Sequence, residues 1–509
     1  MFLGYRNYMA AVTVVGGATV AESFSPDGSS LKLGVFSTPV AMETVFRLLP
    51  EDSCTWMKAN QKHRARLCAH SDGYGDLCDC SVQVPQILLP QPKPLPYDGL
   101  RGVVVLVIAG NRPSSLYRCL FTLLTQNGVN KSRFLVSIDG HHAAVEALLD
   151  VLGIAWIQND MSVDDFPAEG RNSSGFRISR HYIFSLEGAF SKFPEAQRVI
   201  IMEEDLLASP DFFDYFGQTA WLLDADPSLY CVSAWNDHGA LHTSRDIRRL
   251  YRIETHPGYG WMMKRSYFEA VVQEWKNITG DHDWDIWMRS PHLRAERECV
   301  VPSVSRSFHY GIVGAHVNGV LTLAHFTGHL MSAARTHVHL KTEVLLQSNY
   351  ERHIYELLLG PSTVYLNSTL SPCHPEMLPK NFTEGPLVVA FEMVSSDDHT
   401  AWARLGGCHG LWNLDTRGHH RGLFRFDYYN TSVMAVGYPF SEYSWILPPH
   451  VHVIRSLEND EEREELGKLS TQNRMRFRVH DLERFVPALL VEAFSPRPVY
   501  LSADGSFIS

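Results

Sequence analysis

Uniformly apolar runs alternate with amphipathic stretches through residues 102–205. The runs VVVLVIA, FLVSI and VIIM lack the apolar–polar alternation of a strand with one wet face, so they predict strands covered on both faces. Between them, PSSLYRCLFTLL and ISRHYIFSLEGAF repeat apolar residues at helical spacing. Strands that alternate with helices predict an α/β fold with a parallel or mixed sheet and right-handed crossovers.

The flanking segments predict further units around this α/β domain, which we place at residues 101–345. Residues 1–80 hold short strand-like runs, including AAVTVVGGATVAESF, which predicts two strands around a glycine turn, and they end in a cysteine-rich join. Five prolines within residues 81–100 predict an extended linker. Residues 346–455 read as a further packed layer, and residues 456–509 as a charged tail.

Three consecutive acids, Glu203, Glu204 and Asp205, end the apolar run RVII. Helix capping does not account for them, because the next helical pattern starts beyond Asp211, which is itself the candidate cap. Open α/β sheets bind ligands at the C-terminal ends of their strands. Clustered carboxylates at that edge predict magnesium or manganese shared with a substrate phosphate.

Two more polar residues are expected at the same edge of the sheet. Arg112 lies in the turn after the first strand, and Asp139 ends the second strand. That first turn contains Gly110 but no G-x-G-x-x-G, which disfavours a dinucleotide-type Rossmann site. The sequence therefore predicts a rim formed by Arg112, Asp139 and the acid triplet.

Composition narrows the class of protein. The 509 residues are 45% hydrophobic and 20% charged, which suffices for a large core, and the formal net charge is -11. The negative charge argues against nucleic-acid binding. No apolar run reaches the ~18 residues that a membrane span requires.

The chain carries six Asn-x-Ser/Thr sequons among 17 asparagines, at Asn130, Asn172, Asn277, Asn367, Asn381 and Asn430. This excess predicts exposure to a secretory lumen. In such a compartment we expect the nine cysteines to form disulfides. The alternative, a zinc site within residues 54–80, lacks the paired Cys-x₂-Cys spacing.

Beyond the acid triplet, the segments SAWNDHG, HPGYGWMM and HDWDIWMR are rich in aromatic residues, which commonly stack on sugars but more often pack in a core. The segment VSRSFHYGIVGAHVNGV contains Gly311, Gly314 and Gly319. This glycine content predicts a mobile lid, with a surface turn of no function as the alternative.

These segments, together with VIAGNRPSSLYRCL, SIDG, ISRHY and EEDLLASPDFFDYF, occur in an order and spacing that resembles the N-acetylglucosaminyltransferase I family. The EED triplet, HYGIVG, the tail LWNLDTRGHHRGLFR and the cysteine cluster resemble the O-mannose branch of that family more closely than its N-glycan branch. The resemblance runs from about Cys54 to about Ile454. It implies a GT-A fold with a Rossmann-like sheet, a remnant of a β-rich stem domain and a C-terminal extension.

The resemblance also implies an inverting transfer of N-acetylglucosamine from UDP-N-acetylglucosamine with Mn²⁺ as cofactor. Carried over to this chain, Arg112 and Asp139 would hold the uracil end, with His181 also near the nucleotide. The other carried-over roles place Glu203 and Glu204 at the uridine and ribose and Asp205 on the manganese ion.

The segment GDHDWDIWMR offers three acids, and the resemblance favours Asp285 as the catalytic base. Asp281 and Asp283 precede the expected helix and suit capping, although Asp283 stays open as the alternative base. Trp284 and Trp287 flank Asp285, where apolar rings could seat a sugar and raise the proton affinity of its carboxylate. The related motif WDDWMR has a second acid that this chain lacks.

The tail LWNLDTRGHHRGLFR is expected on the acceptor side. Trp412 offers a stacking face, and Arg417 and Arg421 offer donors to a sugar or a peptide. A buried aromatic residue with surface arginines is the alternative.

Three functions remain open from the sequence. The first is β-1,2 transfer to mannose on an O-mannosylated glycoprotein, the second is the same transfer to N-glycan mannose, and the third is a catalytically dead glycan-binding lectin. The family implies residence in the Golgi lumen. Because Met1 falls inside what resembles the end of the stem domain, we expect a partial gene product without the membrane anchor.

Overall fold

The computed structural model divides the chain into two units, Met1–Leu48 and Leu49–Ser509. In the first unit the structure describes only the backbone of its strands. In the second unit it describes residues 54–69, 74–89, 93–160, 173–277, 283–311, 325–456 and 499–503, and the backbone of residues 507–508. Within these residues no helix combines the length and the apolar character needed to cross a membrane.

The first unit is a four-stranded sheet in the order β1-β2-β3-β4. Strands β2 and β3 pair antiparallel on either side of Gly16 and Gly17, so the predicted hairpin is confirmed. The strands of this unit are β1 Phe2–Tyr5, β2 Tyr8–Val15, β3 Ala18–Phe24 and β4 Ser30–Leu31.

The second unit is built on an eight-stranded sheet with the order β11-β13-β10-β12-β8-β5-β6-β7. Strands β12 and β11 run antiparallel to their neighbours, and the others run the same way as one another. This mixed, mainly parallel sheet confirms the predicted α/β class. Its strands are β5 Val103–Ala109, β6 Phe134–Asp139, β7 Ala155–Asn159, β8 Arg198–Glu203, β10 Leu229–Ser233, β11 Leu250–Ile253, β12 Trp261–Lys264 and β13 Glu298–Pro302.

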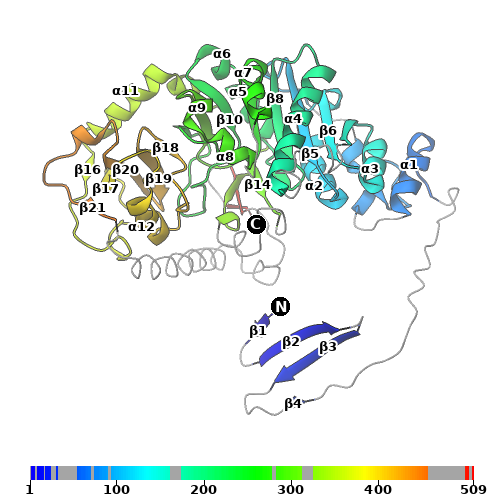
Figure 1. Ribbon diagram of the computed structural model, residues 1–509, viewed down its shortest axis with the longest axis horizontal. Coiled ribbons are helices and arrows are strands. Elements are labelled where there is room, and N and C mark those ends of the chain that lie inside the picture. Colours follow the sequence, from blue (N-terminus) through cyan, green and yellow to red (C-terminus); the bar gives the residue numbers. More distant parts are fainter. Residues whose placement is uncertain are drawn as a thin grey trace. The chain divides into compact units, whose positions relative to one another are not determined.

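Helices cover both faces of this sheet (Figure 1), which explains why its central strand is apolar throughout. Val105 and Val107 of β5 share a core with α2, α3 and α5, whereas Val104 and Leu106 share the opposite core with α4, α7 and α8. These helices are α2 Pro113–Leu124, α3 Ala143–Leu152, α5 Phe212–Thr219, α4 Ser174–Lys192, α7 Arg265–Lys276 and α8 Trp284–Met288.

Asp211 occupies the N-cap position of α5 but makes no side-chain cap bond. Its carboxylate instead accepts hydrogen bonds from Ser209 Oγ at 2.7 Å and from Arg306 Nε at 3.1 Å. The expected capping by this side chain is therefore wrong, because a buried arginine competes for the same oxygens.

A second sheet, drawn in yellow to orange in Figure 1, has the order β16-β17-β20-β19-β18, with β21 paired to β17. Helix α12 packs on it, and the Trp402 ring stacks on Phe424 at a centroid distance of 3.7 Å. Its elements are β16 Val364–Tyr365, β17 Leu387–Met393, α12 Thr400–Cys408, β18 His419–His420, β19 Leu423–Tyr428, β20 Thr431–Pro439 and β21 Val453–Ile454. We call it the C-terminal sheet.

Short elements complete the second unit. Strand β9 follows the acid triplet directly and pairs antiparallel with β14, so that His309 lies opposite Leu206. Strand β22 pairs with β15 and with β23. The remaining elements are α1 Lys58–Cys68, η2 Gly75–Leu77, η3 Gln86–Leu88, η4 Lys131–Arg133, β9 Leu206–Ala208, α6 Leu222–Ala225, α9 Pro291–Arg294, β14 Ser307–His309, β15 Leu330–Ser332, η7 Thr342–Leu345, α11 Gln347–Leu358, η8 Ser444–Ile446, β22 Val499–Leu501 and β23 Phe507–Ile508.

The cysteines confirm the prediction of disulfides over zinc. All nine lie among the described residues, and eight of them are paired as Cys54–Cys80, Cys68–Cys78, Cys231–Cys299 and Cys373–Cys408. The remaining cysteine, Cys119, is buried in α2. The Cys231–Cys299 bond joins β10 to its parallel neighbour β13.

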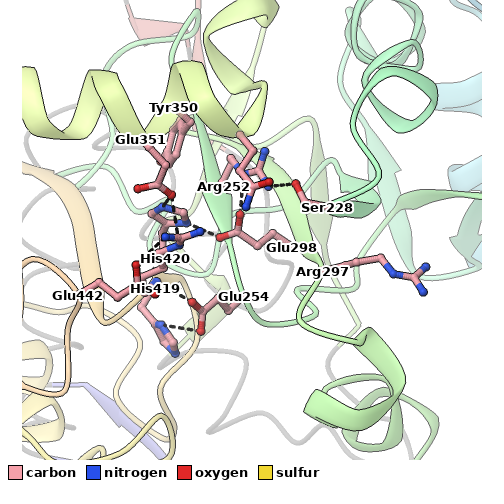
Figure 2. Close-up of polar contacts among 12 residues, drawn as sticks. Ser228, Arg252, Glu254, Arg297, Glu298, Tyr350, Glu351, His419, His420 and Glu442 are labelled. Atoms are coloured by element: carbon pink, nitrogen blue, oxygen red, sulfur yellow. Dashed lines mark hydrogen bonds and ion pairs between the residues drawn. The ribbon is translucent and has the colours of Figure 1, made fainter.

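A cluster of charged side chains lies where the C-terminal sheet meets the large sheet, and we call it the seam cluster (Figure 2). Arg252 of β11 donates to Glu298 Oε2 at 2.6 Å and to Asp226 Oδ2 at 2.8 Å. His420 of β18 contacts Glu298 through Nδ1 and Glu351 Oε1 through Nε2, the latter at 3.0 Å. The seam cluster therefore ties β18 to β13 and α11.

Candidate active site

The acid triplet lies at the end of β8, next to the turn between β5 and α2. Arg112, the N-cap residue of α2, donates from Nε to Glu204 Oε1 at 2.7 Å. The backbone N–H of Gly110 donates to Glu204 Oε2 at 3.1 Å. Burial raises the pKa of Glu204, although Arg112 acts against that rise. Arg112 and the triplet thus come together at the C-terminal ends of β5 and β8.

Asp205 is the most constrained acid of the triplet. One oxygen, Oδ2, accepts from Arg112 Nη2 at 3.1 Å and lies 3.6 Å from His309 Nε2. Burial alone would raise its pKa, but His309 and Arg112 outweigh burial and bring the pKa to about 2. Asp205 is therefore a carboxylate at any physiological pH.

Among the residues that the structure describes, the second oxygen of Asp205, Oδ1, is buried and has no hydrogen-bond partner, and the same is true of His309 Nδ1. Buried polar atoms normally have partners, so these two suggest a missing ligand. A carboxylate oxygen such as Asp205 Oδ1 suits Mn²⁺, whereas an imidazole nitrogen is more typical of zinc, copper, iron and nickel sites. The residues present therefore fit a manganese ion that is shared with substrate phosphates, although among the described residues no group of three or more His, Cys, Asp or Glu forms a metal cluster.

Gly311 lies directly against Asp205. A Cβ atom at this position would be 2.6 Å from Asp205 Oδ2, so any side chain would displace the carboxylate. The predicted lid thus begins beside the candidate metal ligand. Its other glycines, Gly314 and Gly319, lie outside the described residues.

Glu203 differs from its two neighbours in the triplet. The hydroxyl of Tyr182 donates to Glu203 Oε1. Burial, reinforced by the charge of Asp205, raises the pKa of Glu203 to about 7. The three consecutive carboxyls therefore differ in pKa, because a tyrosine hydroxyl is the main group that offsets the burial of Glu203, whereas Arg112 contacts the other two acids and His309 adds to its effect on Asp205.

Asp139 and His181 lie near the strand β6, which is the neighbour of β5 in the large sheet. Asp139 is exposed at the end of β6 and accepts from Asn159 Nδ2 at 3.0 Å. His181 of α4 is buried, with Nε2 3.0 Å from Ser137 Oγ. Burial lowers the pKa of His181, while the charge of Asp139 opposes that shift. Asp139 is open to a ligand at the rim, whereas His181 lies beneath it.

Asp285 lies in the first turn of α8. Its Oδ2 accepts from Arg289 Nη2 at 2.6 Å, and its Oδ1 accepts from the N–H of Ile286 at 2.9 Å. Burial would raise its pKa, but Arg289, Arg417 and His256 together lower it. The expected rise in proton affinity is therefore wrong, because three cationic or polar neighbours outweigh the apolar rings.

The other candidate acids lie at the start of the same helix. Asp283 is the N-cap residue of α8, but its side chain makes no cap bond. Asp281 lies outside the described residues.

The two tryptophans beside Asp285 pack inward. Trp284 is only 8% exposed and stacks on Tyr182 at a centroid distance of 4.0 Å. Trp287 stacks on Trp275 at 4.8 Å. The Trp284 ring therefore has little face open to a sugar, whereas Trp287 is half-buried.

The two arginines of the tail motif LWNLDTRGHHRGLFR contact different parts of the protein. Arg417 lies over the Trp412 ring at 4.1 Å, donates to Asp415 at 2.9 Å and lies 3.7 Å from Asp237. Its charge also acts on Asp285, as described above. Arg421 instead pairs with Glu351 at 3.2 Å and with Glu442 at 2.5 Å. Of the two arginines, only Arg417 reaches the surroundings of Asp285.

Sequence reasoning missed Asp237, Tyr259 and His309. Asp237 is buried, and burial raises its pKa to about 6 against the opposing charge of Arg417. Tyr259 has a φ of 49° between two glycines that also have positive φ, a backbone strain that clusters at functional sites. Its ring lies 5.4 Å from His309 and 5.0 Å from Trp235. The flanking glycines of PGYGW were the signal that could have revealed Tyr259.

Comparison with known proteins gives one family match. The model of the GNT-I family matches residues 89–360. An alpha-1,3-mannosyl-glycoprotein 2-beta-N-acetylglucosaminyltransferase from Arabidopsis thaliana is 33% identical over 215 residues, which cover 42% of this chain and 47% of that enzyme. The chain thus matches about half the length of this curated relative.

Solved structures resemble the chain more distantly. A GalNAc-T7 structure with UDP, GalNAc and Mn²⁺ has a TM-score of 0.30 and 9% identity, over 40% of this chain and 43% of that chain. Mouse xyloside xylosyltransferase 1 has a TM-score of 0.24 and 14% identity, over 38% of this chain and 83% of that chain. Both scores are too low to align individual site residues.

Proposed function

Because the chain belongs to the GNT-I family, we propose that it is an inverting glycosyltransferase that moves N-acetylglucosamine from UDP-N-acetylglucosamine to mannose in β-1,2 linkage. The observation that carries the proposal is the rim at the end of β8, where one buried carboxylate oxygen of Asp205 has no partner within the described part of the chain. A lectin that only binds glycans has no use for such an acid beside Arg112. We therefore set the lectin alternative aside.

Donor binding falls to the residues at the ends of β5, β6 and β8. Asp205, with His309 beside it, would hold Mn²⁺, which when bound would offset the negative charge of the leaving diphosphate. Arg112, Glu204 and exposed Asp139 would orient the uridine through hydrogen bonds. Buried His181, which contacts Ser137 on the strand that ends in Asp139, would lie near the nucleotide.

Asp285 is proposed as the general base. Its lowered pKa keeps it ionised, so it can take the proton from the mannose 2-hydroxyl as that oxygen attacks the anomeric carbon. Arg289 holds one of its oxygens at 2.6 Å and so fixes the direction of the carboxylate. Attack from the face opposite the leaving UDP inverts the anomeric centre.

The proposed acceptor is an O-mannosylated glycoprotein in the Golgi lumen. The support is the tail segment, whose Arg417 acts on Asp285 through its charge and lies over the buried Trp412 ring, so that the ring supports the arginine rather than offering a free stacking face. Four disulfides and six sequons suit a secretory compartment. N-glycan mannose is the second candidate acceptor, since the Arabidopsis relative is named as a mannosyl-glycoprotein enzyme.

A transfer assay with two acceptors tests the proposal. The protein is incubated with UDP-N-acetylglucosamine and Mn²⁺ and with either an O-mannosyl peptide or a mannose-terminated N-glycan, and products are read by mass spectrometry. We expect one added N-acetylhexosamine on the O-mannosyl peptide and none with Asp205→Ala. Transfer to the N-glycan alone would move the chain to the second acceptor, and no transfer to either would refute the proposed activity.

A further inference from the structure

Hydrogen bonds hold the backbone of the segment from Arg417 to Arg421 near the edge strand β11 of the large sheet. The ring of His238 donates from Nε2 to the carbonyl of Arg417 at 2.9 Å, and the N–H of Glu254 donates to the carbonyl of His419 at 2.9 Å. The N–H of Arg421 donates to Glu254 Oε1 at 2.7 Å. This segment therefore fixes where Arg417 stands relative to Asp237.

Gly418 shows how close this approach is. Its φ is 87°, and a Cβ atom there would lie 2.6 Å from His238 Nε2. Its N–H donates to Thr255 Oγ1 at 3.2 Å. The residue before β18 thus packs closely against residues that follow β10 and β11, and a side chain at Gly418 would not fit.

His420 lies at the centre of the seam cluster, between two carboxyl groups from different elements (Figure 2). Its Nδ1 contacts Glu298 of β13, and its Nε2 lies 3.0 Å from Glu351 Oε1 of α11. Ionised carboxylates only accept hydrogen bonds, and a neutral imidazole has only one N–H. Two such contacts require an extra proton, so the geometry demands an imidazolium or a protonated carboxyl.

The surrounding groups favour the imidazolium. Arg252 donates to Glu298 at 2.6 Å from the side away from His420. The hydroxyl of Tyr443 donates to Glu351 Oε2 at 2.7 Å, and Arg421 Nε lies 3.2 Å from Glu351 Oε1. Each carboxylate is thus stabilised by a cation or a donor, which leaves the extra proton to His420.

The titration of the cluster agrees with this assignment. Burial would lower the pKa of His420, but Glu298 and Glu351 outweigh burial and raise it. Burial would raise the pKa of Glu298, but His420 and Arg252 bring it to about 2. The Tyr350 ring also packs edge-on to His420 at 4.9 Å and adds no charge.

The neighbouring histidine behaves in the opposite way. His419 lies 3.6 Å from Glu254, and burial, the largest effect, lowers its pKa despite that carboxylate. His419 is also near His420, whose charge adds to this lowering. The pKa values of these two adjacent buried histidines therefore shift in opposite directions, because His420 contacts two acids at close range.

We propose that His420 acts as a proton-dependent pin that holds the C-terminal sheet, and with it Arg417, against the large sheet. When His420 loses its proton, one ring nitrogen must turn a lone pair toward a carboxylate, and the contact becomes repulsive. The seam then opens more readily and Arg417 loses its fixed position. Only the consequence for catalysis rests on the proposed function, since the docking itself needs no substrate.

The sign of the pH dependence follows from the raised pKa of His420. A group whose pKa is higher in the docked state stabilises docking fully below its free value of about 6.5. That stabilisation is lost as pH rises through the docked pKa. Between these two values the opening equilibrium should increase by about tenfold per pH unit.

Hydrogen exchange on the native protein measures this opening directly. The reporter amides are those of Glu254 and Arg421, which donate across the seam, and amides of β5 serve as the internal control. Exchange is followed by mass spectrometry from pH 6 to pH 9 and corrected for base-catalysed exchange chemistry. We expect corrected opening at the seam to rise by about tenfold per pH unit between pH 6.5 and the docked pKa of His420 and then to level off, while β5 stays constant. A seam that opens equally at all pH values would overturn the proposal.

Two matched variants identify the group responsible. His420→Gln should open the seam already at pH 6 and remove its pH dependence, because glutamine cannot carry the extra proton. His419→Gln should keep the pH dependence of the wild type. If His419→Gln abolishes the pH dependence and His420→Gln keeps it, the responsible group is His419, and the proposal for His420 is overturned. Seam opening that follows pH in a protein without transferase activity would leave the pin intact and refute only the proposed function.

Discussion

At the scale of single residues, the site depends on how closely Gly311 approaches Asp205. Gly311→Ala would place a methyl group 2.6 Å from Asp205 Oδ2 and so displace the candidate metal ligand. We expect the affinity for Mn²⁺ with UDP, measured by isothermal titration calorimetry, to fall by about tenfold or more. Changes in residues that contact a metal-ligating side chain commonly lower metal affinity by this factor.

Gly110→Ala provides the matched control for that variant. A Cβ atom at Gly110 would lie 3.6 Å from Glu204 Oε1, an ordinary contact, so Mn²⁺ and UDP should bind nearly as in the wild type. Equal affinities for the Gly311→Ala and Gly110→Ala variants would contradict the placement of the metal at Asp205.

Asp285 carries the prediction about the chemical step. Asp285→Asn keeps the size of the side chain and removes the base, so kcat should fall by about 10²-fold or more while UDP affinity stays near normal. Because the pKa of Asp285 is lowered, protonation of this base should not limit the wild-type rate anywhere above about pH 4. Steady-state kinetics from pH 5 to pH 8 check both points. The assignment fails if Asp283→Asn gives the loss and Asp285→Asn does not.

At the scale of elements, the two arginines that flank β18 have partners in different places. Arg417→Ala should raise the acceptor KM more than the donor KM, because Arg417 lies toward Asp237 and Asp285. Arg421→Ala removes a partner of Glu351 and should lower the melting temperature, with smaller effects on both KM values. Kinetics and melting of the two variants side by side measure this division. An exchange of the two patterns would contradict it.

The seam cluster also predicts an acid limit to stability. The pKa of Glu298 is held near 2, so its stabilising contacts are present above about pH 4.5 and are lost as pH falls toward 2. Glu298→Gln breaks a buried ion pair, which costs about 3–5 kcal/mol at neutral pH. The melting temperatures of variant and wild type should therefore converge as pH falls from 7 to 3.

Glu442→Gln is the control for that comparison. Glu442 is an exposed partner of Arg421, and surface ion pairs contribute little, so its melting curve should stay near that of the wild type at every pH. A constant gap between Glu298→Gln and wild type down to pH 3 would mean that Glu298 does not titrate as described.

At the scale of the whole molecule, the sequence predicted the elements whose pattern is local. The apolar runs at β5, β6 and β8 were sufficient to predict the α/β class and the edge where Arg112 and the acid triplet meet, but the strands β7, β10, β11, β12 and β13 of the same sheet were not predicted. The sequence could not predict which side chains from distant segments meet there. His309 reaches Asp205 because β14 pairs with β9. The two strands lie about a hundred residues apart in the sequence, so a local pattern cannot reveal their pairing.

Two further outcomes show the same limit. Arg417 and Arg421 are four residues apart and looked equivalent, yet the turn at Gly418 sends them to different partners. The flanking tryptophans predicted apolar surroundings and a raised pKa for Asp285. Its pKa is instead lowered by Arg289 and by Arg417, which lies far away in sequence. Charges that arrive through tertiary contacts cannot be read from a local motif.

The stereochemistry of the product tests the central claim most directly. UDP-N-acetylglucosamine is an α-linked donor, and attack by the mannose 2-hydroxyl opposite UDP, assisted by Asp285, must give a β linkage. Proton NMR of the purified product formed on an O-mannosyl peptide measures the anomeric configuration and the linked position together. We expect β-linked N-acetylglucosamine on the 2-hydroxyl of mannose. An α linkage, or release of free N-acetylglucosamine with no product on mannose, would contradict an inverting transfer at this site.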